Sequence, residues 1–479
     1  MGPARFYRWF TSGGADRQLS RGYREKCIAI RREAEDCIHF KIFYAQAHNL
    51  AQCLLINKHR DSRHKNQSRK GMTMKVLEDV TIIDFTQRHA GSAATMILAD
   101  FGAHVIKVER PGHLDPAREW APIQEGHSVY FTYLNRGKDS ICVDYTTPEG
   151  KKVILDLVKT ADVVCESLPV GEMERCGLGY EALKEVKPDL IYASVSAFGH
   201  TGPKKDKKAD DLTLQAIGGM MDRTGFADGP ATPVGCRVSN HISAIYLAAG
   251  INLALIHREK TGQGQELDIS ELDCLFAMME TGPWVYNILG KVLPRTGNSY
   301  PSISPYDTLR AKDGFLSVGI STDNQWQKFC AALGMTDLAE NELYKTNESR
   351  GDHYESGLKA ELEAVTSTRG KFEMETVLRE AKLPCAAVYT VSDAMASEHI
   401  AVREMLVELE DDGAGKVTVP GTTVKLDKTP GRAERGAPLA GRDNRAVLTG
   451  LGYSSEEVEA LTAAGIVSEP EAGCPKAAV

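Results

Sequence analysis

Two turns after predicted strands carry residues that bear on ligand chemistry. The turn after the strand predicted at 80–85 reads TQRHAGSAA, with one glycine and no G-x-G-x-x-G pattern. After the next strand, where a carboxylate would hold the ribose diol of a dinucleotide, the chain reads Glu109-Arg110. An arginine suits a ribose phosphate instead, because a guanidinium binds phosphate through a two-pronged fork. The pattern favours a phosphorylated nucleotide such as coenzyme A, with NADP as the weaker alternative.

The stretch from Val238 to Leu272 carries the clearest pattern of the chain, a long helix followed by a strand. Ser239 and Asn240 are strong N-cap residues, and Gly262 with Gly264 ends the long helix that follows. Residues 266–270 then alternate like a half-buried strand. Helical spacing predicts that one apolar face of the helix is buried, formed by Ile242, Ile245, Tyr246, Ala249, Leu253 and Ile256.

Strands and helices alternate from Lys75 onward. Strands are predicted at 80–85, 104–109, 162–165 and 190–195, and helices at 91–101, 148–160 and 180–185. This order with short connections is typical of an α/β protein with a doubly wound, mostly parallel sheet. A strand pair at 417–419 and 423–425 and a helix at 455–463 are predicted to close the chain.

The same patterns predict the domain organisation. Residues 1–71 are rich in Arg and Lys and lack an apolar pattern, so they are expected to be an extension outside the fold. The acidic residues among them fit an organellar presequence poorly, so the predicted location is cytoplasmic, or mitochondrial if the presequence is genuine. The predicted parts are 72–290 (large domain, first part), 291–395 (small α+β domain), 396–467 (return to the large domain) and 468–479 (tail).

Composition narrows the class of partner. Of the 479 residues, 42% are hydrophobic and 25% charged, which is ordinary for a soluble globular protein. The net charge of −8 argues against nucleic acid as the main partner. The eleven cysteines form no C-x-x-C pair and no cluster at metal-binding spacing, so reduced thiols and no metal site are expected. No apolar run approaches the roughly 20 residues of a membrane helix, so no membrane contact is predicted.

Eight motifs, taken in order, resemble one family. They are DFTQRHAG, FGAHVIKVERPG, NRGKDSICVDYTTPEGKK, ADVVCES, SVSAFGHTGP, DLTLQAIGG, REKTGQGQELDIS and SPYDTLRAKDG. Together they are similar to the class III coenzyme A transferases, the CaiB/BaiF family, from about Val76 to Val467. The resemblance implies a large Rossmann-like domain built from both chain ends, a smaller middle domain, and a homodimer of interlocked subunits.

The resemblance also implies which residues contact the coenzyme. Arg110 matches the arginine that meets the nucleotide end, and Ser167 stands where the formyl-CoA transferase branch carries an asparagine. Coenzyme A is expected as a substrate, with no tightly bound cofactor, together with an acyl group and a small carboxylic acid. The implied coenzyme-binding residues are His89, Ala90, Arg110, Val143, Ser167, Leu168, Arg175, Lys208 and Asp210.

Asn240 matches the position of the family's catalytic aspartate. In the family this carboxylate attacks the acyl-CoA thioester to give a mixed anhydride, which the released thiolate converts to an enzyme-bound thioester. An amide cannot form that anhydride, so three hypotheses stay open. The chain is a CoA-transferase that works through a ternary complex or uses another acid, such as Asp210 or Asp211. Alternatively, it is a non-catalytic CoA-binding subunit that pairs with an active paralogue, or an acyl-CoA racemase or epimerase.

Overall fold

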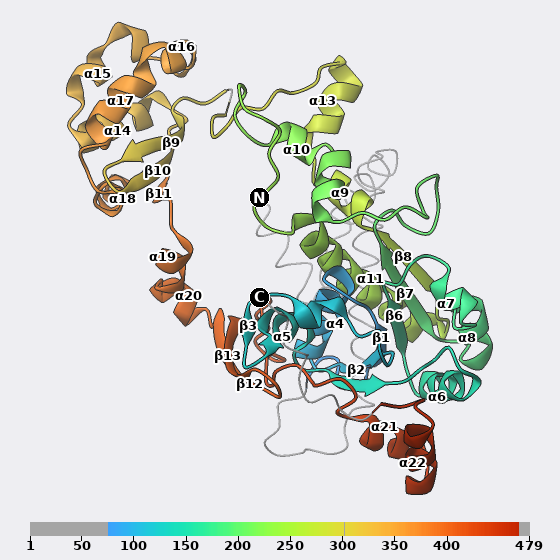
Figure 1. The fold of residues 1–479 in the computed structure, drawn as a ribbon. Coiled ribbons are helices and arrows are strands. Elements are labelled where there is room, and N and C mark those ends of the chain that lie inside the picture. The colour runs from blue at the N-terminus through green and yellow to red at the C-terminus, as the bar shows by residue number, and fades with distance from the viewer. Residues whose placement is uncertain (1–74, 301, 469–479) are drawn as a thin grey trace, which may run out of the picture. The chain divides into compact units, whose positions relative to one another are not determined.

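The computed structural model describes residues 75–300 and 302–468, and its centre is a six-stranded parallel sheet (Figure 1). The predicted extension at 1–71 lies outside the described residues, as does the predicted tail except for Ser468. The strands stand in the order β5-β2-β1-β6-β7-β8, which reverses direction once, between β1 and β6. Their bounds are β1 (Thr81–Phe85), β2 (His104–Glu109), β5 (Asp139–Cys142), β6 (Val163–Glu166), β7 (Ile191–Ser196) and β8 (Glu266–Ser270). The predicted parallel α/β sheet is confirmed.

Helices cover both faces of this sheet, because alternate strand side chains point into two different cores. Ile82 joins one core with helices α4 (Ala90–Asp100), α5 (Val129–Asn135) and α11 (Val238–Thr261). Ile83 and Phe85 join the other, which is covered by α6 (Pro148–Val158), α8 (Tyr180–Val186), α21 (Asn444–Gly450) and α22 (Ser455–Ala463).

The C-terminal segment returns to the edge of this sheet. Asp443 Oδ2 accepts a hydrogen bond from Ser140 N at 2.8 Å, and Asn444 Oδ1 accepts one from Cys142 N at 2.9 Å. Both bonds tie the segment before α22 to strand β5, an edge strand that would otherwise leave backbone donors unpaired. Both ends of the described chain therefore contribute to the large sheet.

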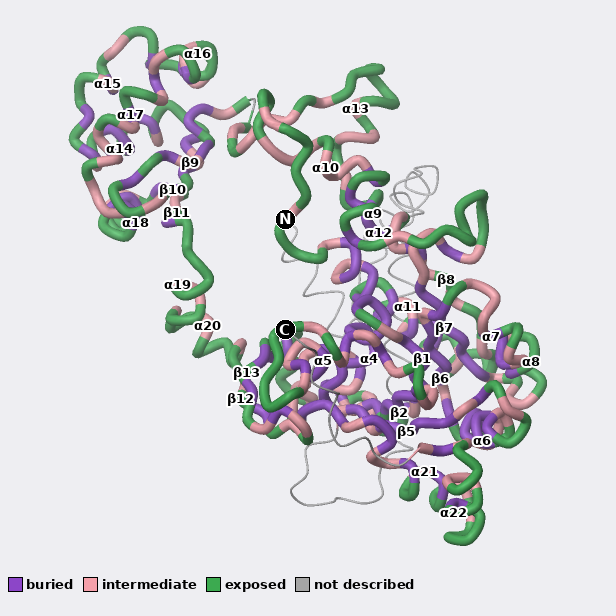
Figure 2. Tube along the Cα trace, viewed as in Figure 1, coloured by how far each residue is buried: buried purple, intermediate pink, exposed green. Residues whose placement is uncertain are grey.

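The long helix α11 has the predicted length but not the predicted buried face. Its buried side chains are mostly small, including Ser243, Ala244 and Ala248, and they pack on α4, β7 and β8. The large residues expected in the core face outward instead, with Leu253 68% and Ile245 57% exposed. In Figure 2 the tube of α11 carries both the buried and the exposed colour. That prediction was wrong, because a helix with apolar residues all round its surface gives no sign of which side meets the sheet.

The start of α11 also differs from the prediction. The cap position is Arg237, which makes no side-chain cap bond, so neither Ser239 nor Asn240 is the N-cap. The carboxylate of Asp211, from the neighbouring helix α9 (Asp211–Ile217), accepts from Ser239 N at 2.8 Å and also from Ser239 Oγ. A side chain from another helix thus satisfies a free amide of the first turn.

By length and composition, helix α11 is also the one helix in the described ranges that could cross a membrane: it has 24 residues, and an 18-residue stretch of it has a mean hydropathy of 1.3. No segment was expected to meet this criterion of length and composition, and that expectation was wrong; the predicted absence of membrane contact stays a prediction. The finding is weak evidence for a membrane, since core helices of soluble proteins meet the same criterion, and one face of α11 packs on the sheet.

The middle of the chain forms an antiparallel sheet with its own core. Strands β9 (Tyr306–Ala311), β10 (Gly314–Gly319) and β11 (Cys385–Ala387) pack with helices whose buried residues include Trp326 and Leu378. The later strand pair is β12 (Leu406–Asp411) with β13 (Gly415–Pro420), so the strand predicted at 423–425 is wrong and its partner lies earlier in the chain. The domain boundaries at 291 and 396 stay predictions.

The remaining elements lie between or beside those already described. They are η1 (Pro116–Glu119), β3 (Ile123–Gln124), β4 (His127–Ser128), α7 (Glu172–Arg175), α10 (Met220–Arg223), α12 (Glu271–Ala277), α13 (Thr281–Leu289), α14 (Asp323–Leu333), α15 (Thr336–Glu340), η2 (Glu342–Tyr344), α16 (Asn347–His353), η3 (Tyr354–Leu358), α17 (Lys359–Thr366), α18 (Lys371–Glu380), α19 (Val391–Met395) and α20 (Glu398–Val402).

Candidate functional site

Most predicted coenzyme-binding residues lie at the carboxyl ends of the parallel strands. His89 follows β1, Arg110 follows β2 and Ser167 follows β6. Strands β1 and β6 are neighbours at the reversal of strand order, and Gln87 N donates to Ser167 Oγ at 2.8 Å across it. Ligands of open α/β sheets bind in the crevice at such a reversal.

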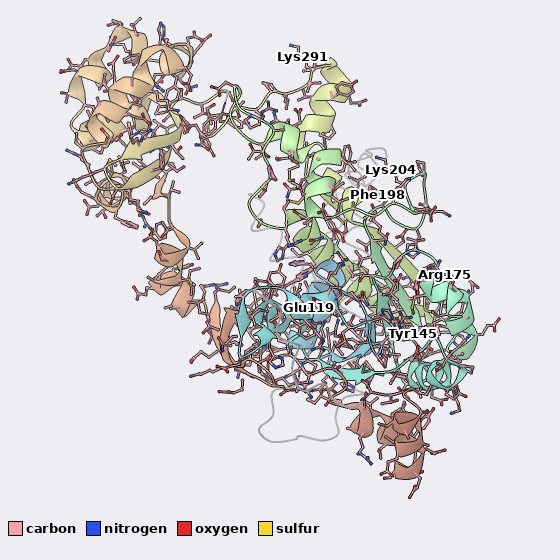
Figure 3. All side chains as sticks on the ribbon, viewed as in Figure 1. Glu119, Tyr145, Arg175, Phe198, Lys204 and Lys291 are labelled. Carbon is pink, nitrogen blue, oxygen red and sulfur yellow. The ribbon has the colours of Figure 1, made fainter. Side chains whose placement is uncertain are left out.

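Arg110 has the surroundings of an anion-binding residue. Its Nε is buried and has no hydrogen-bond partner among the described residues. Its charge acts on Tyr145, where burial raises the pKa to about 12 and the Arg110 guanidinium works in the opposite direction. Burial also raises the pKa of the Cys176 thiol against the pull of Arg110, Arg175 and Lys151. Figure 3 labels Tyr145 and Arg175 in this part of the molecule.

A buried ionic network fixes the loops that carry these residues. Lys107 Nζ donates to Thr86 O at 2.8 Å and to Asp115 Oδ2 at 2.9 Å, and Arg88 N donates to Asp115 Oδ1 at 2.9 Å. Lys138 Nζ lies 2.8 Å from Asp84 Oδ2, and both side chains are fully buried. These bonds hold the turn after β1 in place, including Arg88 with its φ of 65°.

The other residues predicted to contact the coenzyme are either buried, exposed on the surface or already hydrogen-bonded within the protein. Leu168 is buried with its amide bonded to Glu166, and Val143 is fully buried with its amide bonded to Glu109 O. Arg175 is 63% exposed and pairs with Glu172. Lys208 is exposed, in the loop where the Lys204 ammonium lies 5.7 Å from the centre of the Phe198 ring (Figure 3). Asp210 caps α9, where its Oδ1 accepts from Thr213 N at 2.9 Å.

A second group of polar residues meets where α4, α11 and α12 come together. Asn240 is buried, and its Nδ2 donates to Oε2 of Glu271 at 2.7 Å. Next to it in the chain, His241 lies against His89, with ring centroids 4.4 Å apart and the rings nearly perpendicular. Neither ring nitrogen of His89 has a hydrogen-bond partner in the described chain. Ala90 is buried beside it as the first residue of α4.

The electrostatics of this corner favour neutral forms. Burial, together with His241 and Arg237, lowers the pKa of His89 to about 3, although Asp211 acts to raise it. Burial likewise lowers the pKa of His241. Burial raises the pKa of Glu271 to about 7, and the Asn240 hydrogen bond only partly opposes it. Both rings are therefore uncharged at neutral pH, while the carboxyl group titrates there.

Glu271 and Glu166 are two buried carboxyl groups near the predicted residues that the sequence reasoning did not single out. Glu271 is the first residue of α12, where a carboxylate reads as an ordinary helix-start residue. Glu166 ends β6, and burial raises its pKa to about 8. A carboxylate at the end of a fully buried strand is the signal that could have identified it. No group of side chains suited to a metal ion occurs in the described ranges.

A separate cavity of about 350 Å³ lies beside the loop after β2. Its lining includes His113, Asp115, Arg118, Phe131 and Asp411. None of the residues predicted to bind the coenzyme lines it, so it is not assigned to the coenzyme.

Comparisons with known proteins agree with this architecture. A family model described as CoA-transferase family III matches residues 77–444. The succinyl-CoA:mesaconate CoA-transferase of Haloarcula hispanica is 38% identical over 400 residues, which cover 81% of this chain and 99% of that protein. The succinyl-CoA:glutarate CoA-transferase of Homo sapiens is 32% identical over 404 residues, covering 83% and 91%.

The fold comparison gives the same answer. The crystal structure of a CAIB/BAIF family protein from Brucella suis superimposes with a TM-score of 0.74 at 32% identity, and the match covers 79% of this chain and 99% of that one. The family predicted from the motifs is confirmed. This chain belongs to CoA-transferase family III, the CaiB/BaiF family of enzymes that use CoA thioesters.

Proposed function

We propose that this chain transfers coenzyme A from succinyl-CoA to a small dicarboxylic acid. Relatives that match almost over their full length are named for succinyl-CoA as donor and for mesaconate or glutarate as acceptor. The observation that carries the proposal in this chain is Arg110. Its Nε is buried without a hydrogen-bond partner among the described residues, and Arg110 follows β2, the neighbour of β1 on the side away from the reversal at which open α/β sheets bind ligands.

The coenzyme would lie along the carboxyl edge of the sheet. Arg110 would bind a phosphate of the nucleotide, and the turns at His89 and Ser167 would pass beneath the pantetheine arm. Arg175 and Lys208 are exposed and would act from outside, as cations that attract the phosphates. Val143 and Leu168 are buried and would contribute by holding the backbone at the ends of β5 and β6 in place.

Arg237 would be the cation that holds the second carboxylate of a dicarboxylic acid. It is exposed, and its guanidinium lies 5.1 Å from the centre of the Trp120 ring. It is also close enough to His89 to depress the pKa of that ring. A guanidinium at the rim of the Asn240 corner would select acids with a free carboxylate at the far end.

We also propose a homodimer, in line with the interlocked dimer that the resemblance implies. Large apolar side chains are exposed along α11 (Leu253) and along α13 (Trp284 and Ile288, 69% and 73% exposed). Apolar surface of this kind marks a protein interface. Replacing Leu253 with Asp should shift the mass measured by light scattering from dimer to monomer, while Lys260→Asp, at the exposed end of α11, should leave it unchanged.

The alternatives predict different products. A non-catalytic subunit would bind CoA without transferring it, and a racemase would exchange a proton beside the thioester without changing the acid. The decisive experiment incubates the purified full chain with succinyl-CoA and mesaconate, glutarate or acetate, and identifies the CoA esters by mass spectrometry. Transfer to a dicarboxylate and not to acetate supports the proposal. No transfer, or deuterium uptake from heavy water without transfer, contradicts it.

The cellular location stays a prediction, cytoplasmic or mitochondrial.

A further inference from the structure

The carboxylates near Asn240 differ in whether they are free to react. Asp211 is buried and accepts from Ser239 N, Ser239 Oγ and Gln215 Nε2, the last at 2.7 Å. Asp210 is occupied in capping α9, where Thr213 N and Thr213 Oγ1 both donate to its Oδ1. Both carboxylates therefore hold helix starts in place, and neither has the freedom of a nucleophile.

Glu271 is placed differently. It starts α12 directly after β8, and α12 packs against both α9 and α11, which brings the carboxylate to the first turn of α11. Within the part of the chain that the structure describes, one hydrogen bond is found for its side chain, from Asn240 Nδ2 to Oε2 at 2.7 Å. No ion pair to Glu271 occurs within the described chain, so Oε1 is left without a bound cation. The amide thus orients the carboxylate without neutralising it.

We propose that Glu271 is the nucleophile of the transfer reaction, and that Asn240 positions it. The inference rests on the proposed CoA transfer and names the residue that would form the covalent intermediate. Glu271 would supply the carboxylate that the chemistry requires, and the Asn240 amide would orient it.

The reaction balances with the groups present. Glu271 Oε1 attacks the thioester carbonyl of succinyl-CoA, the C–S bond breaks, and the thiolate of CoA leaves a mixed anhydride. The thiolate then attacks the glutamyl carbonyl, which releases succinate and leaves a glutamyl-CoA thioester. The acceptor carboxylate attacks that thioester and expels the thiolate, which finally attacks the acceptor's acyl carbon. The products are the new acyl-CoA and the free Glu271 carboxylate, with no net proton change.

The surroundings of Glu271 support this role. A carboxylate paired with a cation is a weak nucleophile, and among the described residues Glu271 has only an amide donor. Burial raises the pKa of Glu271 to about 7, so its ionised form is poorly stabilised while still populated at neutral pH, which suits a nucleophile. The histidines His89 and His241 are held neutral, so neither would compete as a counter-ion.

The first half-reaction provides the test, because it needs only the acyl donor. The full chain is incubated with succinyl-CoA, treated with hydroxylamine, and digested for peptide mass spectrometry. We expect a hydroxamate at Glu271. Glu271→Gln should abolish the label and slow transfer about 10⁶-fold, the size seen when a nucleophile is removed. Asp273→Asn, an exposed residue of the same helix, should keep both.

The outcomes separate this inference from the proposed function. A label on another carboxylate, or transfer without any label, overturns the role of Glu271 and leaves the function standing. A label at Glu271 without transfer to any dicarboxylate supports the inference and overturns the acceptor class. Neither label nor transfer overturns both. Retained CoA binding by Glu271→Gln shows that the variant is folded.

Discussion

Two buried polar regions of this protein use carboxylates in opposite ways. Beneath the strand ends, Asp84 meets Lys138 at 2.8 Å and Glu109 meets Arg118 at 2.5 Å. In the corner between α4, α11 and α12, Glu271 meets Asn240 at 2.7 Å. The contact distances are alike, but the partner is a cation in the first region and a neutral amide in the second.

The nature of the partner decides the charge state of each buried carboxyl group. Burial alone would raise the pKa of Glu109, but Arg118 and Lys107 outweigh it and hold the pKa at about 2. For Glu271 burial prevails and the pKa is about 7. A permanently ionised pair suits a structural role, since it keeps the loops at the carboxyl ends of the strands in one arrangement. A carboxylate without a cation is costly to ionise, and that cost is consistent with a chemical role.

The largest effect on stability should come from breaking a buried ion pair beneath the strand ends. Lys138→Met removes the cation nearest to Asp84 and leaves a buried charge short of compensation. We expect the free energy of unfolding to fall by about 3–5 kcal/mol in urea denaturation. Lys152→Met, which breaks the exposed Lys152–Asp156 pair, is the control and should match the parent protein. Equal effects would mean that the buried network is not structural.

Glu271, in the corner between α4, α11 and α12, should have a smaller, pH-dependent effect on stability. Because the folded-state pKa of Glu271 (about 7) lies above its ordinary value of 4.5, the unfolded chain releases this proton first as pH rises. Stability therefore falls between about pH 4.5 and 7, by about 3 kcal/mol at most. Glu271→Gln lacks this loss and should be the more stable protein at pH 8 but not at pH 4. Parallel curves for variant and parent would place the pKa of Glu271 near its ordinary value.

Arg110 extends the comparison to a cation for which no ion pair is found among the described residues. Arg110→Ala should weaken CoA binding by about 1.5–3 kcal/mol, the range for a charged hydrogen-bonded contact, and should reduce its salt dependence. Calorimetric titration with CoA measures this. Lys205→Ala, in an exposed loop, is the control and should bind as the parent does. Unchanged affinity in Arg110→Ala would remove Arg110 from the coenzyme site.

The sequence predicted the sheet well because its signals are local. The strand predicted at 104–109 and the helix predicted at 455–463 have the observed bounds, and the turns after the strands carry the residues assigned to the coenzyme. The buried face of α11 could not be predicted, because small residues such as Ala244 pack on the sheet while larger ones such as Leu253 face outward.

The candidate nucleophile, Glu271, could not be predicted from the sequence for a different reason. Asn240 could be matched to the family's aspartate by counting along the chain, and that count showed only a missing carboxylate. Glu271 lies 31 residues later, and its contact with Asn240 depends on how α12 packs against α11. Only the three-dimensional arrangement shows an amide and a carboxylate side by side.

The most direct test exchanges those two groups. In the double variant Asn240→Asp with Glu271→Gln, the carboxylate stands at position 240 and an amide at position 271, across the same contact. The measurement is the rate of CoA transfer from succinyl-CoA, with the hydroxylamine label mapped by mass spectrometry. We predict that the double variant recovers about 10²-fold or more of the transfer rate lost in Glu271→Gln, and that the label moves to position 240. A folded double variant as inactive as Glu271→Gln, or full activity in Glu271→Gln alone, would contradict the account.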